Sequence, residues 1–338
     1  MSAGMTGRLQ AGRAAVPLLL LAIVFVVVPG VLALIGAGYY IRLAQLTLIT
    51  IILTTSLNLL VGTAGLLSIA MVAFYGIGAY TSAILATRYG TPFLLNIVAS
   101  GAVAAAIGFL LALPIMRLVS IFFAVATLGI AASFHTIVIN WSGLTRGAMG
   151  IPNIPSLSAF GFNLSSPFAS YYVIALTCTI AVAVIHRLTH SYYGNAVRAV
   201  REDEECARAM GIGATRLKIE VFTVSSFFLG VAGSLLAHTA LYISPDMFQL
   251  IESILVLTAI VVGGLGSVPG AVAGALILVL VPEAVRGLGD LRALAFGCVL
   301  FLSILLLPRG LFGEVSALRL IRKQLGAARD GRRTFGWR

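Results

Sequence analysis

Long apolar runs recur along this chain and alternate with short polar stretches. Most runs approach the length of about 20 residues that a helix needs to cross a hydrocarbon core about 30 Å thick, and the run at 253–264 is shorter. Backbone amides in lipid must be hydrogen-bonded within the segment, so such runs indicate helices. The alternating strands that are typical of membrane β-barrels are absent. The pattern predicts an all-α, polytopic transmembrane bundle of about ten segments, at residues 16–36, 43–61, 66–86, 94–113, 119–139, 171–186, 219–240, 253–264, 268–284 and 291–308.

Glycines interrupt the segment 66–86 and the region 253–284. We expect these helices to be broken or re-entrant, as is common where transporters form a path near the membrane midplane. Gly266, Gly270 and Gly274 recur at every fourth position. That spacing predicts a helix face on which two backbones pack closely.

Composition excludes an ordinary soluble domain, because 60% of the residues are apolar, 10% are charged and the mean hydropathy is +1.07. Basic residues then set the orientation. With the N-terminus in the cytoplasm, 17 of the 22 Lys and Arg residues lie on the cytoplasmic side, which favours an N-in, C-in topology. The sequence predicts a cytoplasmic N-terminus at 1–15, a transmembrane domain at 16–308 and a basic cytoplasmic tail at 309–338. Within the transmembrane domain it predicts a large external loop at 140–170 and a large cytoplasmic loop at 187–218. The tail directly follows a membrane segment, so it predicts contact with anionic membrane lipid rather than with nucleic acid.

Motifs for catalysis or cofactor binding are absent from the sequence. A P-loop needs a lysine after Gly-x-x-x-x-Gly, but Lys218 follows Leu217 and Lys323 follows Arg322. Paired carboxylates, a His-Glu-x-x-His metal site and a Gly-x-Ser-x-Gly nucleophile are also missing, and the three cysteines lack a metal-binding spacing. We therefore expect no enzyme activity, metal or cofactor in this chain. Any ATP must be bound and hydrolysed by partner subunits.

A charged island stands out from the apolar sequence at residues 187–220 and holds 11 of the 33 charged residues. Good helix formers predict one helix over 195–210. Gly211 suits the left-handed position that closes a helix, and Thr215 is the expected N-cap of the next one. The expected apolar face of the first helix consists of Val197, Val200, Ala207 and Met210.

The segment Glu205-Cys-Ala-Arg-Ala-Met-Gly211 resembles the Glu-Ala-Ala-x-x-x-Gly cytoplasmic loop of ABC importer permeases. In that family the loop forms a coupling helix that sits in a groove of the ATPase subunit. Cys206 stands in place of the usual alanine and is also small. The resemblance implies an ATPase-coupling site composed of Glu204, Glu205, Ala207, Arg208, Met210 and Gly211.

Longer stretches resemble the LivM-type permeases of branched-chain amino acid importers. They include Asn58-Leu-Leu-Val-Gly62, Phe74-Tyr-Gly-Ile-Gly-Ala-Tyr80, Phe123-Ala-Val-Ala-Thr-Leu-Gly129 and Val262-Gly-Gly-Leu-Gly-Ser267. The resemblance implies a heterodimer with a LivH-type permease subunit, two ABC ATPase subunits and a periplasmic solute-binding protein, in the bacterial inner membrane. The chain departs from the family at positions where the family pattern is more polar, namely Leu66, Ala70, Met71, Ala132 and His135.

Few polar residues in the predicted segments mark a solute pathway. Polarity and position favour Asn58, Gly65, Ser68 and His135 as its lining. Asn58 could equally tie two helices together, and an isolated histidine such as His135 or His238 is often a hydrogen-bonded packing residue. The resemblance implies branched-chain or related amino acids as solutes, with urea or short-chain amides as the alternative. From another class, the alternative is an ion-coupled secondary carrier, although such carriers usually place ionisable groups inside the bundle.

Overall fold

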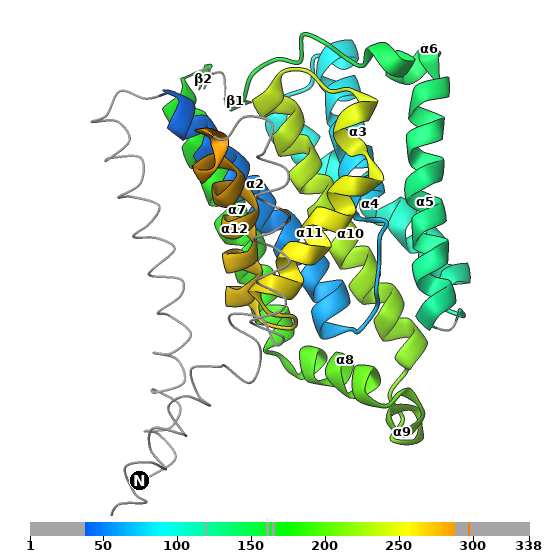
Figure 1. Cartoon of the computed structure of the whole chain (residues 1–338). Helices are drawn as coiled ribbons and strands as arrows, with labels where there is room; N and C mark the ends of the chain where they lie inside the picture. The colour runs from blue at the N-terminus through cyan, green and yellow to red at the C-terminus, as the bar shows by residue number, and fades with distance from the viewer. Residues whose placement is uncertain (1–37, 119, 160–161, 164–165, 288–296, 298–338) are drawn as a thin grey trace, which may run out of the picture.

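The computed structural model describes residues 38–287, apart from 119, 160–161 and 164–165, together with residue 297. The described chain forms a bundle of long helices with two short helices across one end (Figure 1). This architecture confirms the predicted helical bundle. The expected segments and termini at 1–15, 16–36, 291–308 and 309–338 lie outside the described residues, apart from residue 297.

The long helices follow the predicted segments with ends that agree within five residues. Among the described residues, five regions are long and apolar enough to cross a membrane. They are α2 (Gly38–Asn58) with its π-helical extension η1 (Leu59–Thr63), α4 (Phe93–Ile115), α5 (Ser120–Asn140), α7 (Pro167–Thr189) and α10 (Ala214–Ala240). The remaining bundle helices are α3 (Met71–Tyr89) and the two shorter apolar helices α11 (Leu250–Gly263) and α12 (Val268–Ala284).

Short elements lie at both ends of the bundle. At the end drawn at the bottom of Figure 1 lie α8 (Tyr192–Glu202) and α9 (Glu204–Ala209). Toward the opposite end lie α6 (Ser142–Thr145), the 3-10 helices η2 (Gly147–Met149) and η3 (Pro245–Phe248), and the antiparallel strands β1 (Ser158–Ala159) and β2 (Phe162–Asn163). The strand pair is a small departure from the all-α prediction and falls in the predicted external loop.

Basic residues divide between the two ends, as the sequence predicts. Arg117 lines one pocket together with residues of α8 and α9. Arg88 donates a hydrogen bond to the carbonyl of Gly143 at the other end, where Arg286 lies over the ring of Tyr39. The end that carries α8 and α9 is therefore the one that the positive-inside rule assigns to the cytoplasm.

Two helix breaks divide the bundle. The break at 264–267 lies inside the predicted region 253–284, whereas the break at 64–70 covers only the start of the predicted segment 66–86, and α3 continues unbroken through Gly76 and Gly78. Residues 64–70 are non-helical between η1 and α3, and Gly65 has a φ of +70° there. Residues 264–267 separate α11 from α12, with φ values of +121° at Gly264 and +81° at Gly266. Residues with a side chain are strained at such angles, so glycine makes both turns possible.

The helix α10 lies at the centre of the bundle, where α3 and α4 pack along it (Figure 1). Glycine permits this contact, since a Cβ on Gly78 would lie only 2.1 Å from the carbonyl oxygen of Gly230. Ser82 and Ser234 share a hydrogen bond of 2.8 Å between the same two helices. Close backbone approach and a buried polar contact therefore join α3 to α10.

The contact between α3 and α10 predicts that Gly78→Ala destabilises the bundle. The added methyl group would meet the backbone of α10 rather than a movable side chain, so the free energy of unfolding should fall by about 1–3 kcal/mol. Thermal unfolding of the purified chain in detergent measures this change as a lower midpoint temperature. Gly129→Ala is the control, since a Cβ at Gly129 has no neighbouring atom within 4 Å. Equal midpoints for the two variants would contradict the predicted effect.

Candidate functional site

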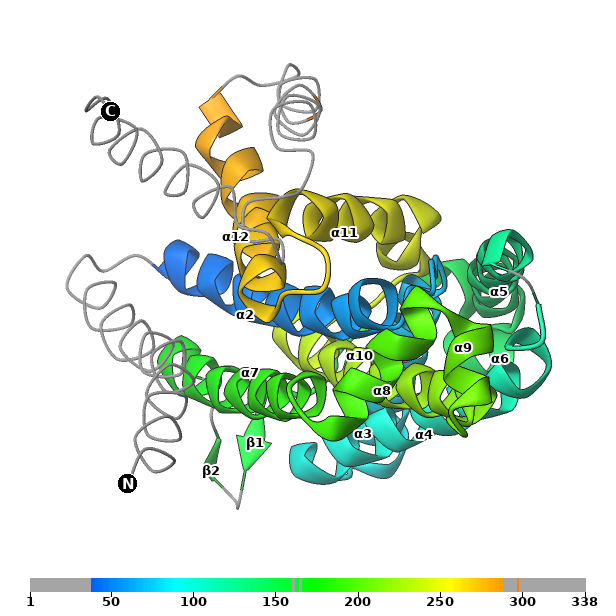
Figure 2. The same cartoon turned by 90° about the horizontal axis from the view of Figure 1, so that it is seen from below.

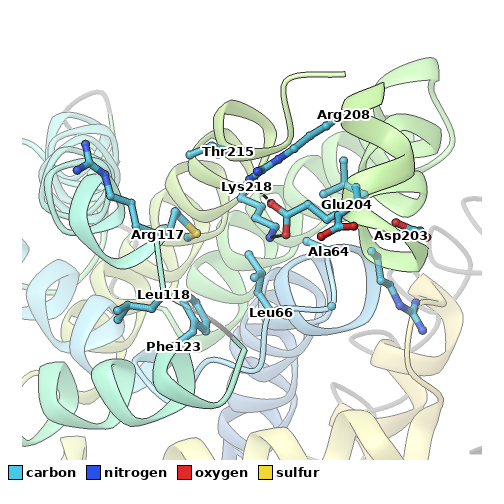
Figure 3. A pocket seen from close by; sticks show the side chains of 15 residues that line it. Ala64, Leu66, Arg117, Leu118, Phe123, Asp203, Glu204, Arg208, Thr215 and Lys218 are labelled. Carbon is cyan, nitrogen blue, oxygen red and sulfur yellow. Dashed lines mark hydrogen bonds and ion pairs between the residues drawn. The ribbon is translucent and has the colours of Figure 1, made fainter. Parts of the chain in front are cut away.

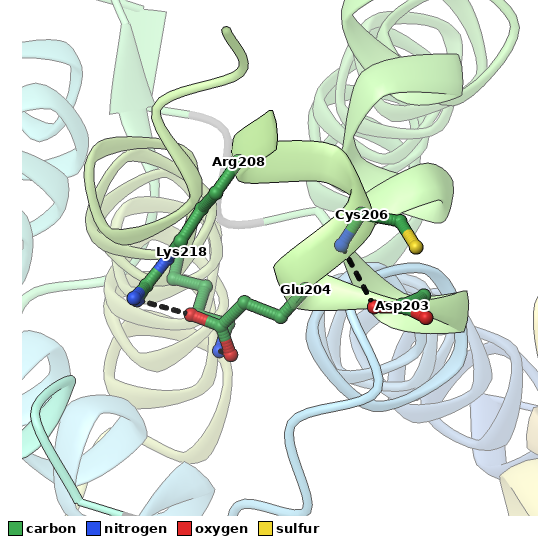
Figure 4. Close-up of polar contacts among 5 residues, drawn as sticks. All are labelled: Asp203, Glu204, Cys206, Arg208 and Lys218. Carbon is green, nitrogen blue, oxygen red and sulfur yellow. Dashed lines mark hydrogen bonds and ion pairs between the residues drawn. The ribbon is translucent and has the colours of Figure 1, made fainter. Parts of the chain in front are cut away.

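The charged island folds into two short helices rather than the single helix predicted over 195–210. Asp203 interrupts the helix with extended backbone angles, φ −154° and ψ 107°. Its Oδ1 accepts a hydrogen bond of 2.9 Å from the amide of Cys206 and so caps α9 (Figure 4); the same bond lowers the pKa of the Asp203 carboxyl. An aspartate that satisfies the first amides of a new helix competes with continuation of the old one. The prediction of one continuous helix is therefore wrong.

Gly211 closes α9 and turns the chain back toward the bundle. Its φ is +84°, in agreement with the predicted left-handed position. Its amide donates a hydrogen bond to the carbonyl of Arg208. The predicted cap of the next helix is wrong, because α10 begins at Ala214 with Gly213 at its N-cap and places Thr215 inside its first turn.

The pair α8 and α9, residues 192–209, is named the α8–α9 element below, and its buried face differs from the predicted one. Val200 and Ala207 pack with Ala214 at the start of α10. Met210, predicted to share this face, is 83% exposed. The reason is that the helix restarts at Asp203, which changes the register of the residues after it.

Glu204 ties α9 to the start of α10. Its carboxylate pairs with Lys218 at 2.5 Å and with Arg208 at 2.6 Å (Figure 4). Partial burial acts to raise the pKa of this carboxyl, but the hydrogen bonds and charges of Lys218 and Arg208 outweigh it and lower the pKa. Glu204 is therefore ionised at neutral pH; its ion pair with Lys218 holds α9 against α10, and its ion pair with Arg208 lies within α9.

The residues predicted to couple to an ATPase gather in one corner at the end of the bundle. Glu204 and Ala207 face the bundle, the first through its ion pairs and the second through burial. The exposed members are Glu205, Arg208, Met210 and Gly211. Four of the six are thus accessible to another protein, and their role in coupling stays a prediction.

A pocket of about 690 Å³ separates the α8–α9 element from the ends of α4 and α5 (Figure 3). Side chains of both charges line it, including Arg117, Lys218 and Glu205, beside an apolar wall that includes Leu66 and Phe123. The α8–α9 element is attached to the bundle mainly through α7, α10 and η1. On the side of α4 and α5 it faces open space.

Asn58 links the end of α2 to the turn between α11 and α12. Its side-chain oxygen accepts a hydrogen bond of 2.9 Å from the amide of Gly266, and its side-chain nitrogen donates one of 3.1 Å to the carbonyl of Ser267. These contacts show that Asn58 ties two helices together, which is one of the two predicted roles. A role in lining the solute pathway stays a prediction.

The other predicted pathway residues lie in different surroundings. Gly65 lines the pocket beside the α8–α9 element. Ser68 is buried, and its hydroxyl accepts a hydrogen bond from the amide of Ala70. His135 is half-buried on α5, and its Nε2 has no hydrogen-bond partner among the described residues. His238 has partners for both ring nitrogens, which is the packing arrangement expected of an isolated histidine.

Two of the three glycines predicted for helix packing lie at the contact between α11 and α12. A Cβ on Gly274 would lie 2.2 Å from the carbonyl oxygen of Ala259, and the carbonyl oxygen of Gly270 would lie 2.0 Å from a Cβ on Gly263. Gly266 does not continue this face, because its φ of +81° places it in the turn before α12. Gly263, which the spacing pattern did not include, takes its place in the contact.

Sequence reasoning missed Arg201 as a functional candidate. This side chain reaches from α8 back to the bundle, where its Nη1 donates a hydrogen bond to the carbonyl of Gly62 at the end of α2. The two residues are 139 positions apart in the chain. Because no local pattern encodes so distant a contact, the sequence alone does not distinguish Arg201 from its charged neighbours.

The tie made by Asn58 predicts that Asn58→Leu lowers the stability of the bundle. Leucine has a similar volume but leaves the amide of Gly266 and the carbonyl of Ser267, both part-buried, without their partner. A fully buried group would lose about 1–3 kcal/mol, so we expect a loss toward the lower end of that range for each group. The thermal midpoint of the purified variant measures the loss. In the control Asn140→Leu, the lost hydrogen bond lies within α5 and is exposed. A midpoint for Asn58→Leu no lower than that of the control would contradict the prediction.

Residues 39–307 match the family described as "Branched-chain amino acid transport system / permease component". The chain is 35% identical to the high-affinity branched-chain amino acid transport system permease protein LivM of Salmonella typhimurium, over 80% of this chain and 69% of the relative.

More distant relatives include the permease protein LivH of Escherichia coli, at 28% identity over 52% of this chain and 59% of the relative. The fructose import permease protein FrcC of Rhizobium meliloti is also 28% identical, over 68% of this chain and 62% of the relative. No solved structure matches the chain.

Proposed function

This chain belongs to the family of permease components of branched-chain amino acid transport systems, and from this premise we propose that it is the transmembrane permease subunit of an ABC importer for branched-chain or related amino acids. The observation that carries the proposal is the family match over residues 39–307, which includes the helical bundle and the α8–α9 element. A multi-pass helical bundle is the architecture that such a role requires.

Two ATPase subunits supply the energy in this proposal, and their docking site is the α9 side of the α8–α9 element together with the corner that follows it, residues 204–211. Support comes from the place of α8 and α9 across one end of the bundle (Figure 2). The side chains of Glu205, Arg208 and Met210 are also exposed. The ion pair between Glu204 and Lys218 joins this surface to α10, the central helix. A displacement of the docked element is therefore passed directly to the core of the bundle.

The remaining partners follow from the family. We propose a LivH-type permease as the second membrane subunit, and the similarity of this chain to LivH supports two related subunits side by side. A periplasmic solute-binding protein would deliver the solute to the end of the bundle opposite the α8–α9 element. The complex would lie in the bacterial inner membrane.

Alternating access is the proposed mechanism. Nucleotide binding to the ATPases shifts the equilibrium between outward-open and inward-open states, because it favours one of them. In the described membrane helices, Asp, Glu, Lys and Arg lie near helix ends. That distribution gives no support to a coupling ion held by charged groups within the bundle, the usual device of ion-coupled carriers.

Uptake into vesicles tests the proposal. We expect that the chain, reconstituted with a LivH-type permease, two ATPases and a loaded binding protein, takes up labelled leucine, isoleucine or valine only when ATP is present. Uptake driven by an ion gradient without the ATPases would contradict the importer assignment. Uptake of urea or a short-chain amide in place of the amino acids would keep the importer and replace the solute.

The left-handed corner at Gly211 yields a second expectation. A β-branched side chain at a φ of +84° is strained by about 1–3 kcal/mol, so Gly211→Val should distort the docking corner and reduce ATP-driven uptake while membrane insertion is unchanged. Gly213→Val is the matched control, since the φ of Gly213 is −74° and a Cβ there has an ordinary contact. Unchanged uptake in Gly211→Val would count against a docked corner at this glycine.

A further inference from the structure

Arg201 connects the α8–α9 element to the bundle at one specific joint. Its Nη1 donates a hydrogen bond of 2.5 Å to the carbonyl of Gly62, in the π-helical extension of α2. Figure 2 views this end of the molecule from below and shows α8 and α9 lying across the ends of the bundle helices. Arg201 thus leaves the charged surface and ends on the backbone of a membrane helix.

Glycines shape the place that receives this side chain. A Cβ on Gly65 would lie 2.8 Å from Cγ of Arg201, and a Cβ on Gly266 would lie 3.6 Å from its Nη1. Both glycines have positive φ values, +70° and +81°. The stem of Arg201 therefore passes Gly65, and its guanidinium group lies between the two helix breaks.

The electrostatics of a helix end favour this contact. The last carbonyls of a helix have no partner within the helix and carry partial negative charge. Gly62 is one residue from the end of η1, and a guanidinium group donates strong, charge-assisted hydrogen bonds to such an oxygen. A π-helical turn is itself common at functional sites.

The same joint includes the turn between α11 and α12. Asn58 holds that turn through Gly266 and Ser267. A Cβ on Gly62 would lie 2.4 Å from the amide nitrogen of Gly266, so the end of α2 and the turn are in direct backbone contact. A force applied to the carbonyl of Gly62 therefore acts on α2, on the segment 64–70 and on the turn together.

We propose that Arg201 is the positioning residue that transmits displacement of the α8–α9 element to the π-helical end of α2 and to the α11–α12 turn. The inference rests on the proposed function, because it assumes that an ATPase moves the α8–α9 element. Lys218 and Glu204 join α9 to α10, whereas Arg201 joins α8 to α2. Arg201 is thus a polar contact through which movement of α8 reaches the two broken regions.

Arg201→Met tests this role in vesicles that contain the complete importer. Methionine keeps most of the stem that packs beside Gly65 and removes the donors to Gly62. The quantity measured is the amount of solute imported per ATP hydrolysed. We expect this ratio to fall about tenfold, the change associated with loss of a charge-assisted hydrogen bond, while ATP hydrolysis continues.

Arg198→Met is the matched control. Arg198 lies on the same helix and also donates to a backbone carbonyl, that of Thr189, which belongs to the adjoining end of α7 rather than to α2. In Arg198→Met the amount of solute imported per ATP hydrolysed should stay within about twofold of the wild-type value, a smaller change than the loss of one charge-assisted hydrogen bond would cause. A normal ratio in Arg201→Met would overturn the proposal. Failure of Arg201→Met to assemble with its partner subunits would also overturn it, since Arg201 would then have a structural role.

A second pair of variants isolates the contact with Gly65. In the wild-type background, Gly65→Ala adds a Cβ that meets the stem of Arg201 and should lower the import ratio. The strain of a side chain at a φ of +70° is common to both backgrounds. In the Arg201→Ala background the stem is absent, so Gly65→Ala should lower the ratio by a smaller factor than in the wild type. Equal effects in both backgrounds would contradict the proposal. Wild-type vesicles test the proposed function separately, because absence of ATP-dependent uptake in them contradicts the importer assignment itself.

Discussion

Backbone polar groups released where a helix breaks inside the membrane must find partners within the protein, because lipid offers none. This constraint governs both breaks in the bundle. At the first break, the amide of Ile69 bonds to Thr127 and that of Val72 to Ser253. At the second break, Asn58 satisfies one amide and one carbonyl of the turn. The side chains that close the breaks come from α2, α5 and α11, so each break is also a junction of several helices.

The two junctions meet near the α8–α9 element. Asn58 lies one turn before Gly62, whose carbonyl receives Arg201, and the turn held by Asn58 borders the same glycine. Regular helices carry their hydrogen bonds internally and pass little force to their neighbours through polar contacts. Broken helices instead depend on neighbouring side chains, so the breaks are the places where the proposed coupling surface and the membrane core interact most directly.

The membrane helices were predictable because one constraint, the thickness of the hydrocarbon core, sets both their length and their apolarity. The corner at Gly211 was predictable because its conformation depends on local backbone angles. The break at Asp203 was missed although its signal is local, since a capping aspartate and good helix formers compete within the same stretch. The wrong prediction that Met210 lies on the buried face followed from that single error. Arg201 could not be found, because its partner Gly62 lies far away in the chain.

Asp203 separates two helices that are anchored to different parts of the bundle. Arg201 fastens α8 to α2, and Glu204 fastens α9 to α10. Between these two anchors lie Glu202, the last residue of α8, and Asp203, whose backbone is extended. A sliding of α2 past α10 that kept both anchors would change the angle between α8 and α9, and Asp203 is the residue at which that angle is set. The angle between α8 and α9 at the surface proposed to contact an ATPase would then depend on the relative position of α2 and α10. By linkage, binding of the ATPase would in turn favour one relative position of these helices.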